Sequence, residues 1–356
     1  MTNSSSHDVS VDYHKPWSSA CGHVARRPRF AISVFFVGAA ISCFFLFKSD
    51  YAFRYLPGNS RSYTYEGLDA ILANASMDDK TVILTTSNRA WSRPGSIVDL
   101  FLESYRIGNQ TNRLLNHLVI ISMDQEAHNR CLSIGIDFHC YNLKTQGFNF
   151  STEAFFMTSE YLEMMWRRID LLSYVLEIGY NFVFTDADIL WFRDPFPRFH
   201  EDADFQIACD SYKGNSYDKN NKPNGGFTYV KSNPRTIKFY KFWYAARRLY
   251  PGKHDQDVLN KIKYHSFINR IGLQMRFLDT AFFGGFCEPS RDFNLVCTMH
   301  ANCCVGLENK INDLKIILQD WKKFTSVTVP VPVPVRSPTW NAPQKCLTSF
   351  QTRHSP

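Results

Sequence analysis

The sequence predicts an α/β protein in which helices cover an open sheet. Between residues 80 and 326, short apolar runs of strand length alternate with longer segments whose apolar residues recur at helical spacing. This stretch is long enough for one large domain with a sizeable core. The formal charge of +7 on 356 residues is mild and forms no basic stripe. The composition therefore excludes a nucleic-acid-binding protein and suits phosphate-bearing ligands or an acidic polymer.

The individual elements follow from local patterns. Pro94-Gly95 is a start signal for the first helix, and Gly179 ends the third. Helices are predicted where apolar residues recur every three or four positions: residues 96–107, 125–134 and 151–178. Strands are predicted where a short run is apolar and β-prone: residues 81–86, 118–122, 137–143, 205–209, 226–230 and 273–278.

One further apolar run, at residues 182–192, contains two carboxylates separated by one residue, Asp186 and Asp188. Side chains two apart on a strand point to the same side, so the pair can converge on one cation or one polyol. A divalent metal that carries a diphosphate would offset the cost of placing acids in this run. We expect the site at the carboxyl end of a central strand, where open α/β sheets bind ligands. The alternative for Asp186 is a turn-capping aspartate.

The N-terminal region predicts a membrane anchor. Residues 30–47 carry no charge, and a run of this length is at the lower edge of what spans a bilayer. A cleaved signal peptide would begin nearer the N-terminus, so a signal anchor is favoured. Three arginines just before the run favour a cytosolic tail at residues 1–29 and a lumenal body. We expect a stem at residues 48–79 and an extended, Pro-rich tail at residues 327–356.

Sequons and cysteines agree with a lumenal body. Glycosylation sequons begin at Asn74, Asn109 and Asn149. Eight of the ten cysteines follow the anchor, and in an oxidising lumen they predict disulfides, with Cys131 and Cys140 as one expected pair. Four crowd into one segment, where the absence of a Cys-x-x-Cys pair favours disulfides over a zinc site: Cys287, Cys297, Cys303 and Cys304.

Four motifs in this order resemble the plant nucleotide-diphospho-sugar transferases of glycosyltransferase family 77. The resemblance covers about residues 80 to 326 and is closest to a mostly uncharacterised plant branch of that family. It implies the GT-A fold, a Rossmann-like mixed sheet flanked by helices, in a single-pass type II Golgi membrane protein. The motifs are Phe184-Thr185-Asp186-Ala187-Asp188 with Trp191-Phe192-Arg193-Asp194-Pro195, then Asn224-Gly225-Gly226-Phe227, then His254-Asp255-Gln256-Asp257, then His300-Ala301-Asn302-Cys303-Cys304.

The same resemblance implies a metal site. Asp186, Asp188 and His300 would hold Mn²⁺ or Mg²⁺, since Mn²⁺ accepts both oxygen and imidazole ligands. Asp186 would also contact the donor ribose. The alternative for His300 is a histidine of the core whose hydrogen bonds are satisfied there.

The remaining motifs imply a donor-sugar pocket. Asp255 would hold sugar hydroxyls, and Gln256 would lie near the anomeric carbon. The alternatives are an ordinary tight turn at the two glycines and simple helix capping by the acids. The other substrate-binding candidates are Asn224, Gly225, Gly226 and Asp257.

The expected activity is metal-dependent, retaining transfer of a pentose or hexose from a uridine diphosphate sugar to a cell-wall polysaccharide or glycoprotein. The metal would neutralise charge on the departing diphosphate. Because no carboxylate is clearly placed as a covalent nucleophile, front-face attack by the acceptor hydroxyl is favoured over a two-step route. The partners that the resemblance allows include other Golgi glycosyltransferases.

Other protein classes also place paired acids after a strand. In phosphatases of the haloacid dehalogenase type the pair usually follows the first strand, whereas here three predicted strands come first. Calcium-binding loops need a third acid and a glycine, which are missing after Asp188. A non-catalytic relative that binds glycans or scaffolds other transferases stays open, although the intact Asp186, Asp188, Asp255 and His300 argue against it.

Overall fold

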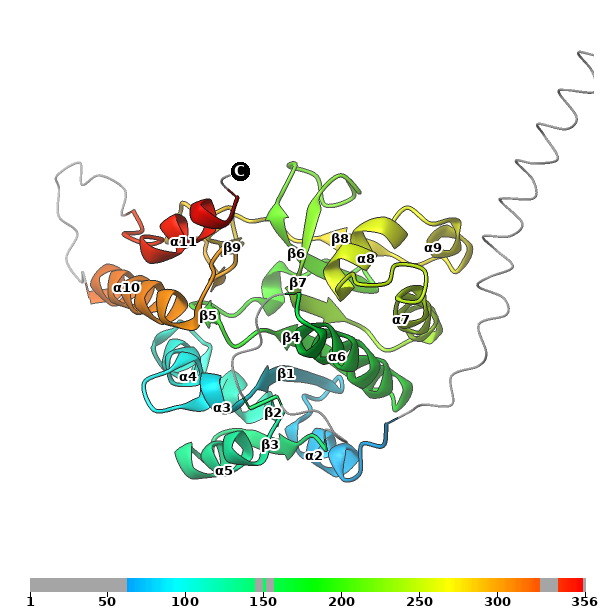
Figure 1. The fold of residues 1–356 in the computed structure, drawn as a ribbon, viewed down its shortest axis with the longest axis horizontal. Coiled ribbons are helices and arrows are strands. Elements are labelled where there is room, and N and C mark those ends of the chain that lie inside the picture. Colours follow the sequence, from blue (N-terminus) through cyan, green and yellow to red (C-terminus); the bar gives the residue numbers. More distant parts are fainter. Residues whose placement is uncertain (1–62, 145–149, 152–156, 327–338, 355–356) are drawn as a thin grey trace, which may run out of the picture. The chain divides into compact units, whose positions relative to one another are not determined.

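The apolar runs of the sequence form a seven-stranded mixed sheet in the computed structural model (Figure 1), which describes residues 63–144, 150–151, 157–326 and 339–354. These residues belong to one compact unit, Gly58–Pro356. The strand order is β3-β2-β1-β4-β7-β6-β8. The first four strands are parallel, whereas β7 is antiparallel to β4 and β6. The strands are β1 (Thr81–Ser87), β2 (Leu118–Ser122), β3 (His139–Asn142), β4 (Asn181–Thr185), β6 (Phe205–Ser211), β7 (Lys222–Val230) and β8 (Met275–Phe277).

A second, three-stranded sheet consists of β5 (Ile189–Trp191), β10 (Thr298–His300) and β9 (Phe283–Gly285), in that order. Strand β10 is antiparallel to β5 and parallel to β9. The run at residues 182–192 is therefore two strands in two different sheets, not one continuous strand. The pair Asp186 and Asp188 lies in the turn between them.

The helices pack against these sheets, and several of them begin at side-chain caps. Asp124 and Thr158 accept hydrogen bonds from the first turns of α5 and α6, and Asn233 forms a capping box with Thr236 at α7. The α-helices are α2 (Leu68–Ala75), α3 (Arg89–Ser92), α4 (Ile97–Ile107), α5 (Gln125–Ile134), α6 (Ser159–Glu177), α7 (Pro234–Ala246), α8 (Asp255–Ile262), α9 (Ser266–Arg270), α10 (Leu307–Ser326) and α11 (Lys345–His354). Two 3₁₀ turns lie at Asn112–His117 and Phe196–Arg198.

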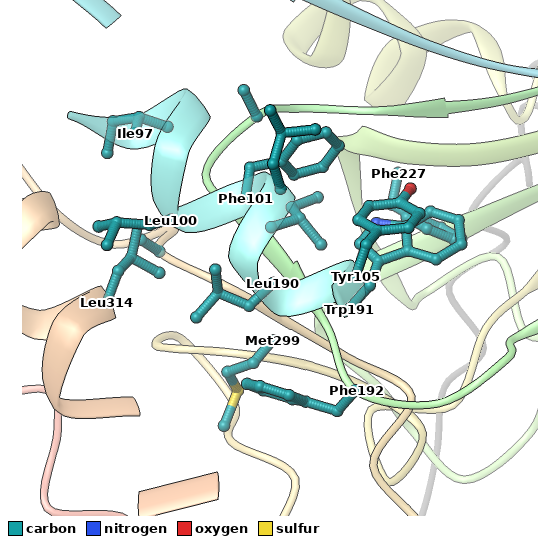
Figure 2. Close-up of a cluster of buried hydrophobic side chains, with 14 of the residues drawn as sticks. Ile97, Leu100, Phe101, Tyr105, Leu190, Trp191, Phe192, Phe227, Met299 and Leu314 are labelled. Atoms are coloured by element: carbon teal, nitrogen blue, oxygen red, sulfur yellow. The ribbon is translucent and has the colours of Figure 1, made fainter. Parts of the chain in front are cut away.

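A large hydrophobic cluster joins the two sheets through α4, and part of it is drawn in Figure 2. Helix α4 contacts β5 on one side and α10 on the other. The Tyr105 ring of α4 stacks on Trp191 of β5 at 4.7 Å between ring centroids. Full burial of a large apolar side chain contributes about 1.5–3 kcal/mol, so this cluster fixes the small sheet against the large one.

Most predicted elements are confirmed. Strand β2 and helix α5 have the predicted bounds, and the other predicted strands and α4 are found within a few residues of theirs. The predicted helix at residues 151–178 is shorter than expected. Helix α6 begins at Ser159 because Thr158 caps it in extended conformation, and residues 152–156 lie outside the described part.

The expected stem is partly wrong, because residues 63–79 are part of the domain. Leu68 and Leu72 of α2 are fully buried, and the Tyr65 hydroxyl donates to Asp170 of α6 at 2.7 Å. The rest of the stem, the cytosolic tail and the anchor at residues 30–47 lie outside the described residues. Among the helices that the structure describes, none combines the length and the hydropathy that crossing a bilayer requires.

The expected extended tail is wrong for residues 339–354. Trp340 stacks on Phe293 at 3.9 Å, and helix α11 lies beside α10 (Figure 1). Cys346 forms a disulfide with Cys304. The Val-Pro alternation ends before this segment, so it does not prevent a helix here.

Two further disulfides link Cys131 to Cys140, as predicted, and Cys287 to Cys303. The expectation that Cys297 is disulfide-bonded is wrong. Its thiol is buried and free, as is that of Cys209. Of the sequon asparagines, Asn74 and Asn109 are exposed, and Asn149 lies outside the described residues.

Candidate active site

A cavity of about 700 Å³ opens where several strands of the large sheet end. It is lined by the last residues of β1, the turn after β4, the end of β6 and the beginning of β7. The end of β10, helix α6 and the first turns of α8 and α10 also contribute to the wall. The cavity is therefore at the predicted edge of the sheet, and both sheets contribute to it.

Three potential metal ligands converge in this cavity: Asp186, Asp188 and His300 have ligand atoms that all lie within 4.8 Å of one another. The antiparallel register of β10 on β5 places His300 opposite Ile189, directly after the acid pair. The Ala301 N–H also donates to the Asp188 carbonyl oxygen at 3.0 Å. The second sheet is thus what brings His300, more than 100 residues away in sequence, to the two carboxylates.

Gly226 makes this convergence possible. Its carbonyl oxygen accepts the Asp186 N–H at 2.7 Å. A Cβ atom at this position would lie 2.7 Å from Asp186 Oδ2 and 2.7 Å from His300 Cε1, which is closer than real Cβ atoms come to such neighbours. Any side chain here would push the Asp186 carboxylate and the His300 ring away. A glycine is therefore required for the β7 backbone to lie this close to both side chains.

Lys310 of α10 pairs with the buried carboxylate of Asp188, with Nζ 2.5 Å from Oδ2. His300 Nε2 lies 3.2 Å from Oδ1. Burial alone would raise the pKa of Asp188, but the Lys310 ammonium and the His300 imidazole hold it well below the usual range. Asp188 is therefore a carboxylate at neutral pH.

Arg168 of α6 is buried and links two acids of the cavity. Its guanidinium nitrogens lie 2.9 Å from Asp186 Oδ1 and 2.6 Å from Asp255 Oδ2. Burial raises the pKa of Asp186, and Arg168 opposes that rise. Burial acts in the same direction on Asp255, but Arg168 and His254 bring the pKa of Asp255 to about 2. Both guanidinium contacts hold α6 and α8 at the cavity wall.

A second polar group of the cavity surrounds Asp210, at the end of β6. Its carboxylate accepts hydrogen bonds from the side-chain amides of Asn224, Gln256 and Asn302. The Gln256 amide oxygen accepts the Gly225 N–H at 2.9 Å. Four predicted sugar-pocket residues, Asn224, Gly225, Gly226 and Gln256, thus belong to one network.

The structure places most of the predicted site residues at this cavity. Gly225 and Asp257 are not among the residues that line the cavity. The Asp257 side chain is 42% exposed, and its Oδ1 lies 3.5 Å from His254 Nε2. The helical repeat explains the difference, because Asp257 is two residues after Asp255 in α8 and so points to another side. The sequence analysis missed three charged residues of the wall, Arg168, Asp210 and Lys310. Arg168 interrupts the regular spacing of apolar residues in its helix. That interruption is the one local signal from which a functional role of Arg168 could have been predicted.

The donor set fits a divalent metal. The cavity lining contains two side chains with a permanent positive charge, Arg168 and Lys310. It also contains four carboxylates, so two negative charges remain unbalanced: Asp186, Asp188, Asp210 and Asp255. Asp188 Oδ1 is buried and faces His300 Nε2 at 3.2 Å, and among the described residues no group donates a well-aligned hydrogen bond to it. Two carboxylates with one imidazole are ligands that Mn²⁺ accepts. A divalent cation would both satisfy this oxygen and balance the charge.

Comparisons with known proteins identify the family of the chain. A family model described as nucleotide-diphospho-sugar transferase matches residues 113–314. Two Arabidopsis thaliana proteins described as uncharacterized are similar over most of the chain. At4g15970 is 50% identical over 81% of this chain and 75% of that protein, and At1g28695 is 36% identical over 91% and 94%. A UDP-galactose:fucoside alpha-3-galactosyltransferase of Dictyostelium discoideum is 39% identical over 71 residues, 18% of this chain and 10% of that protein. The match of the family model over more than half of the chain, together with these relatives, shows that the chain belongs to the nucleotide-diphospho-sugar transferase family.

Proposed function

We propose that the protein is a metal-dependent glycosyltransferase that moves a sugar from a uridine diphosphate sugar to an acceptor hydroxyl. The observation that carries the proposal is the convergence of Asp186, Asp188 and His300 in a cavity with an excess of negative charge. An anionic diphosphate would be repelled by that charge unless a cation entered with it. The uridine nucleotide is supported by the similarity to the UDP-galactose:fucoside alpha-3-galactosyltransferase of Dictyostelium.

In this proposal Asp186, Asp188 and His300 hold Mn²⁺ or Mg²⁺. The cation would supply charge neutralisation for the departing diphosphate. A cation bound to Asp188 would weaken the attraction between that carboxylate and Lys310. The Lys310 ammonium would then be available to contact a phosphate oxygen. Arg168 stays between Asp186 and Asp255 and keeps both carboxylates oriented.

We further propose that transfer retains the anomeric configuration by front-face attack. The acceptor oxygen forms a bond to the anomeric carbon as the bond to the diphosphate oxygen breaks, and the leaving phosphate takes the acceptor proton. Asp255 is a poor covalent nucleophile because it is buried and paired with Arg168, and Asp257 does not line the cavity. A glycosyl adduct trapped on either residue would overturn this step.

The remaining parts of the proposal concern donor, acceptor and location. The donor is a pentose or hexose, and the acceptor is a cell-wall polysaccharide or glycoprotein. The protein acts in the Golgi lumen as a type II membrane protein with the GT-A fold of glycosyltransferase family 77. Three disulfides and two exposed sequon asparagines support an oxidising lumenal compartment.

The test is donor turnover by the full chain. Purified protein with Mn²⁺ is supplied with a panel of uridine diphosphate sugars, and free UDP is measured. We expect release from at least one donor, with a loss of about 100-fold or more in Asp188→Ala and on addition of a chelator. Asp137→Asn, an exposed acid far from the cavity lining, is the matched control and should keep full activity. If folded protein releases UDP from no donor, with or without candidate acceptors, the non-catalytic glycan-binding alternative replaces this proposal.

A further inference from the structure

The sheet order arranges the cavity in three zones. From β1 through β4 to β7 and β6, the lining residues change from Ser87 and Trp91, to the metal-ligand cluster, to the Asp210 group. A nucleotide diphosphate sugar is a linear molecule with its diphosphate in the middle. If the proposed function holds, a diphosphate at the metal ligands leaves one end zone for the nucleoside and the other for the sugar. The zone around Asp210 is rich in hydrogen-bonding groups and so suits the sugar.

Asp210 is the centre of that zone. Its Oδ1 accepts from Asn224 Nδ2 at 2.8 Å and from Asn302 Nδ2 at 2.8 Å. Its Oδ2 accepts from Gln256 Nε2 at 3.0 Å. The three donors come from β7, α8 and the segment after β10, so one carboxylate holds three separate parts of the wall together.

The three amides cannot turn to satisfy another partner. Each amide oxygen already accepts a backbone N–H: Asn224 from Gly226 at 2.9 Å, Gln256 from Gly225 at 2.9 Å, and Asn302 from Cys287 at 3.1 Å. Their nitrogens must therefore face Asp210, which in turn must be an acceptor. An ionised carboxylate meets that requirement with both oxygens.

The charge of Asp210 has no counterion. Among the described residues, no lysine, arginine or histidine forms an ion pair with it, although each amide contributes a partial positive charge. Arg168, the buried cation of the neighbouring wall, is committed to Asp186 and Asp255. Oδ2 accepts a single hydrogen bond, so it keeps acceptor capacity toward the cavity.

We propose that Asp210 is a specificity-determining residue that restricts the donor to uncharged sugars. A sugar hydroxyl can donate to Oδ2 of Asp210. The carboxylate of a uronic acid in the same place cannot donate a hydrogen bond and is repelled by Asp210. In the described part of the chain, no lysine, arginine or histidine pairs with Asp210, and Arg168 is committed to Asp186 and Asp255. Asp210 also positions Gln256 and Asn224, so removing its side chain changes the fit of every donor sugar. Its negative charge, by contrast, repels only those donor sugars that carry a carboxylate.

The experiment compares donors that differ in one carboxylate. Displacement of labelled UDP from the full chain in Mn²⁺ is measured with UDP-glucose against UDP-glucuronic acid, and UDP-galactose against UDP-galacturonic acid. In each pair we expect the uronic acid to bind about 10- to 100-fold more weakly than the neutral sugar. Asp210→Asn removes the charge at nearly constant shape, although it also replaces the acceptor that faces Gln256 by a donor and so weakens the fit of both donors in a pair. Because that effect is common to both donors, the ratio should fall to about threefold or less. Asp137→Asn removes an exposed charge elsewhere and should keep the wild-type ratio.

Equal binding of uronic and neutral donors by the wild type, or a ratio unchanged in Asp210→Asn, overturns the role of Asp210 while leaving the proposed function intact. The wild-type ratio is measured without any variant, so the role of Asp210 can be refuted even if Asp210→Asn folds poorly. If labelled UDP itself does not bind in Mn²⁺, the proposed function and this inference fall together.

Discussion

The seven-stranded sheet and the C-terminal region, residues 283–326 and 339–349, build the same cavity but are held together in different ways. The large sheet relies on hydrogen-bonded strands and on apolar side chains that are completely buried, such as Phe182 and Phe184 of β4. In the C-terminal region β9 and β10 have three residues each. In addition to the hydrophobic cluster that it shares with α4 and β5, two disulfides and a few buried polar side chains hold that region in place.

The most important of these polar side chains is Asp313 of α10. It is fully buried and accepts the backbone N–H groups of Gln344, Lys345 and Cys346 at 2.8–3.1 Å. It therefore caps the beginning of α11 from a different helix. The Trp340 indole donates to the Ser290 carbonyl at 2.7 Å and adds a second link.

The difference matters because the metal-ligand cluster takes members from both regions. Asp186 and Asp188 follow a strand of the large sheet, whereas His300 and Lys310 belong to the C-terminal region. The geometry of the cluster thus depends on cross-links as well as on the hydrophobic core. Disturbing the large sheet should cost global stability, whereas loosening the C-terminal region should also cost metal binding.

The largest effect is expected from the large sheet. Phe182→Ala should lower the free energy of unfolding by about 3–5 kcal/mol, because it leaves a cavity beneath Tyr240, whose ring contacts Phe182 edge-on. Urea denaturation gives the value. Leu132→Ala, at a side chain that is 61% exposed, is the control and should change stability by at most about 0.5 kcal/mol. A small loss in Phe182→Ala would show that the sheet is not the main source of stability.

The next contrast is between two disulfides. Replacing Cys304 and Cys346 by serine should lower stability by about 2–4 kcal/mol and weaken Mn²⁺ binding measured by calorimetry, since α11 and the residues after His300 lose their link. Replacing Cys131 and Cys140, whose disulfide lies at the far edge of the large sheet, should lower stability without changing Mn²⁺ affinity. Equal loss of Mn²⁺ affinity in both double variants would contradict the separation of the two regions.

A smaller and conditional effect is expected at Lys310. In metal-free protein, Lys310→Met leaves the buried Asp188 carboxylate with less compensation and should lower stability by about 1–3 kcal/mol. Added Mn²⁺ should recover most of that loss, so the rise in thermal midpoint with metal should be larger than in wild type. Lys322→Met, on the same helix but paired with Glu103 at the surface, should show the wild-type rise. A metal response identical to wild type in Lys310→Met would mean that Lys310 and the cation do not share Asp188.

The smallest effect concerns an ion pair at the edge of the large sheet. Burial alone would raise the pKa of Asp204, but hydrogen bonds from Arg235, the Gln274 N–H and Asn233 lower it. Because its pKa is lower in the folded protein, the carboxylate stabilises the fold at a pH above its pKa in the unfolded chain, which is about 4. This contribution is lost as the pH falls through the pKa of the folded protein. Asp204→Asn should therefore be less stable than wild type at pH 7, and the difference should shrink below about pH 4. A difference that is constant with pH would show that the charge of Asp204 does not contribute.

Elements whose signals are local could be predicted from the sequence. Strand β2 and helix α5 have their predicted bounds because periodic burial and a capping aspartate are properties of consecutive residues. The pair Cys131 and Cys140 is close in sequence as well as in space. The acid pair at Asp186 and Asp188 stands out for the same reason, since two charges interrupt an apolar run.

The side chains that complete the site from far away in the sequence could be identified only from the three-dimensional structure. Lys310 is 122 residues from Asp188, and Arg168 is 87 residues from Asp255. A lysine within a helix carries no local mark of its partner, because the pairing depends on how α10 packs beside α4 and on the disulfide that holds α11. Periodicity records which face of an element is buried, whereas partners across the fold are fixed by packing between elements. Local sequence patterns therefore indicated three carboxylates and two amides of the candidate active site, whereas Asp210 and the cations Arg168 and Lys310 became apparent only from the packing between elements.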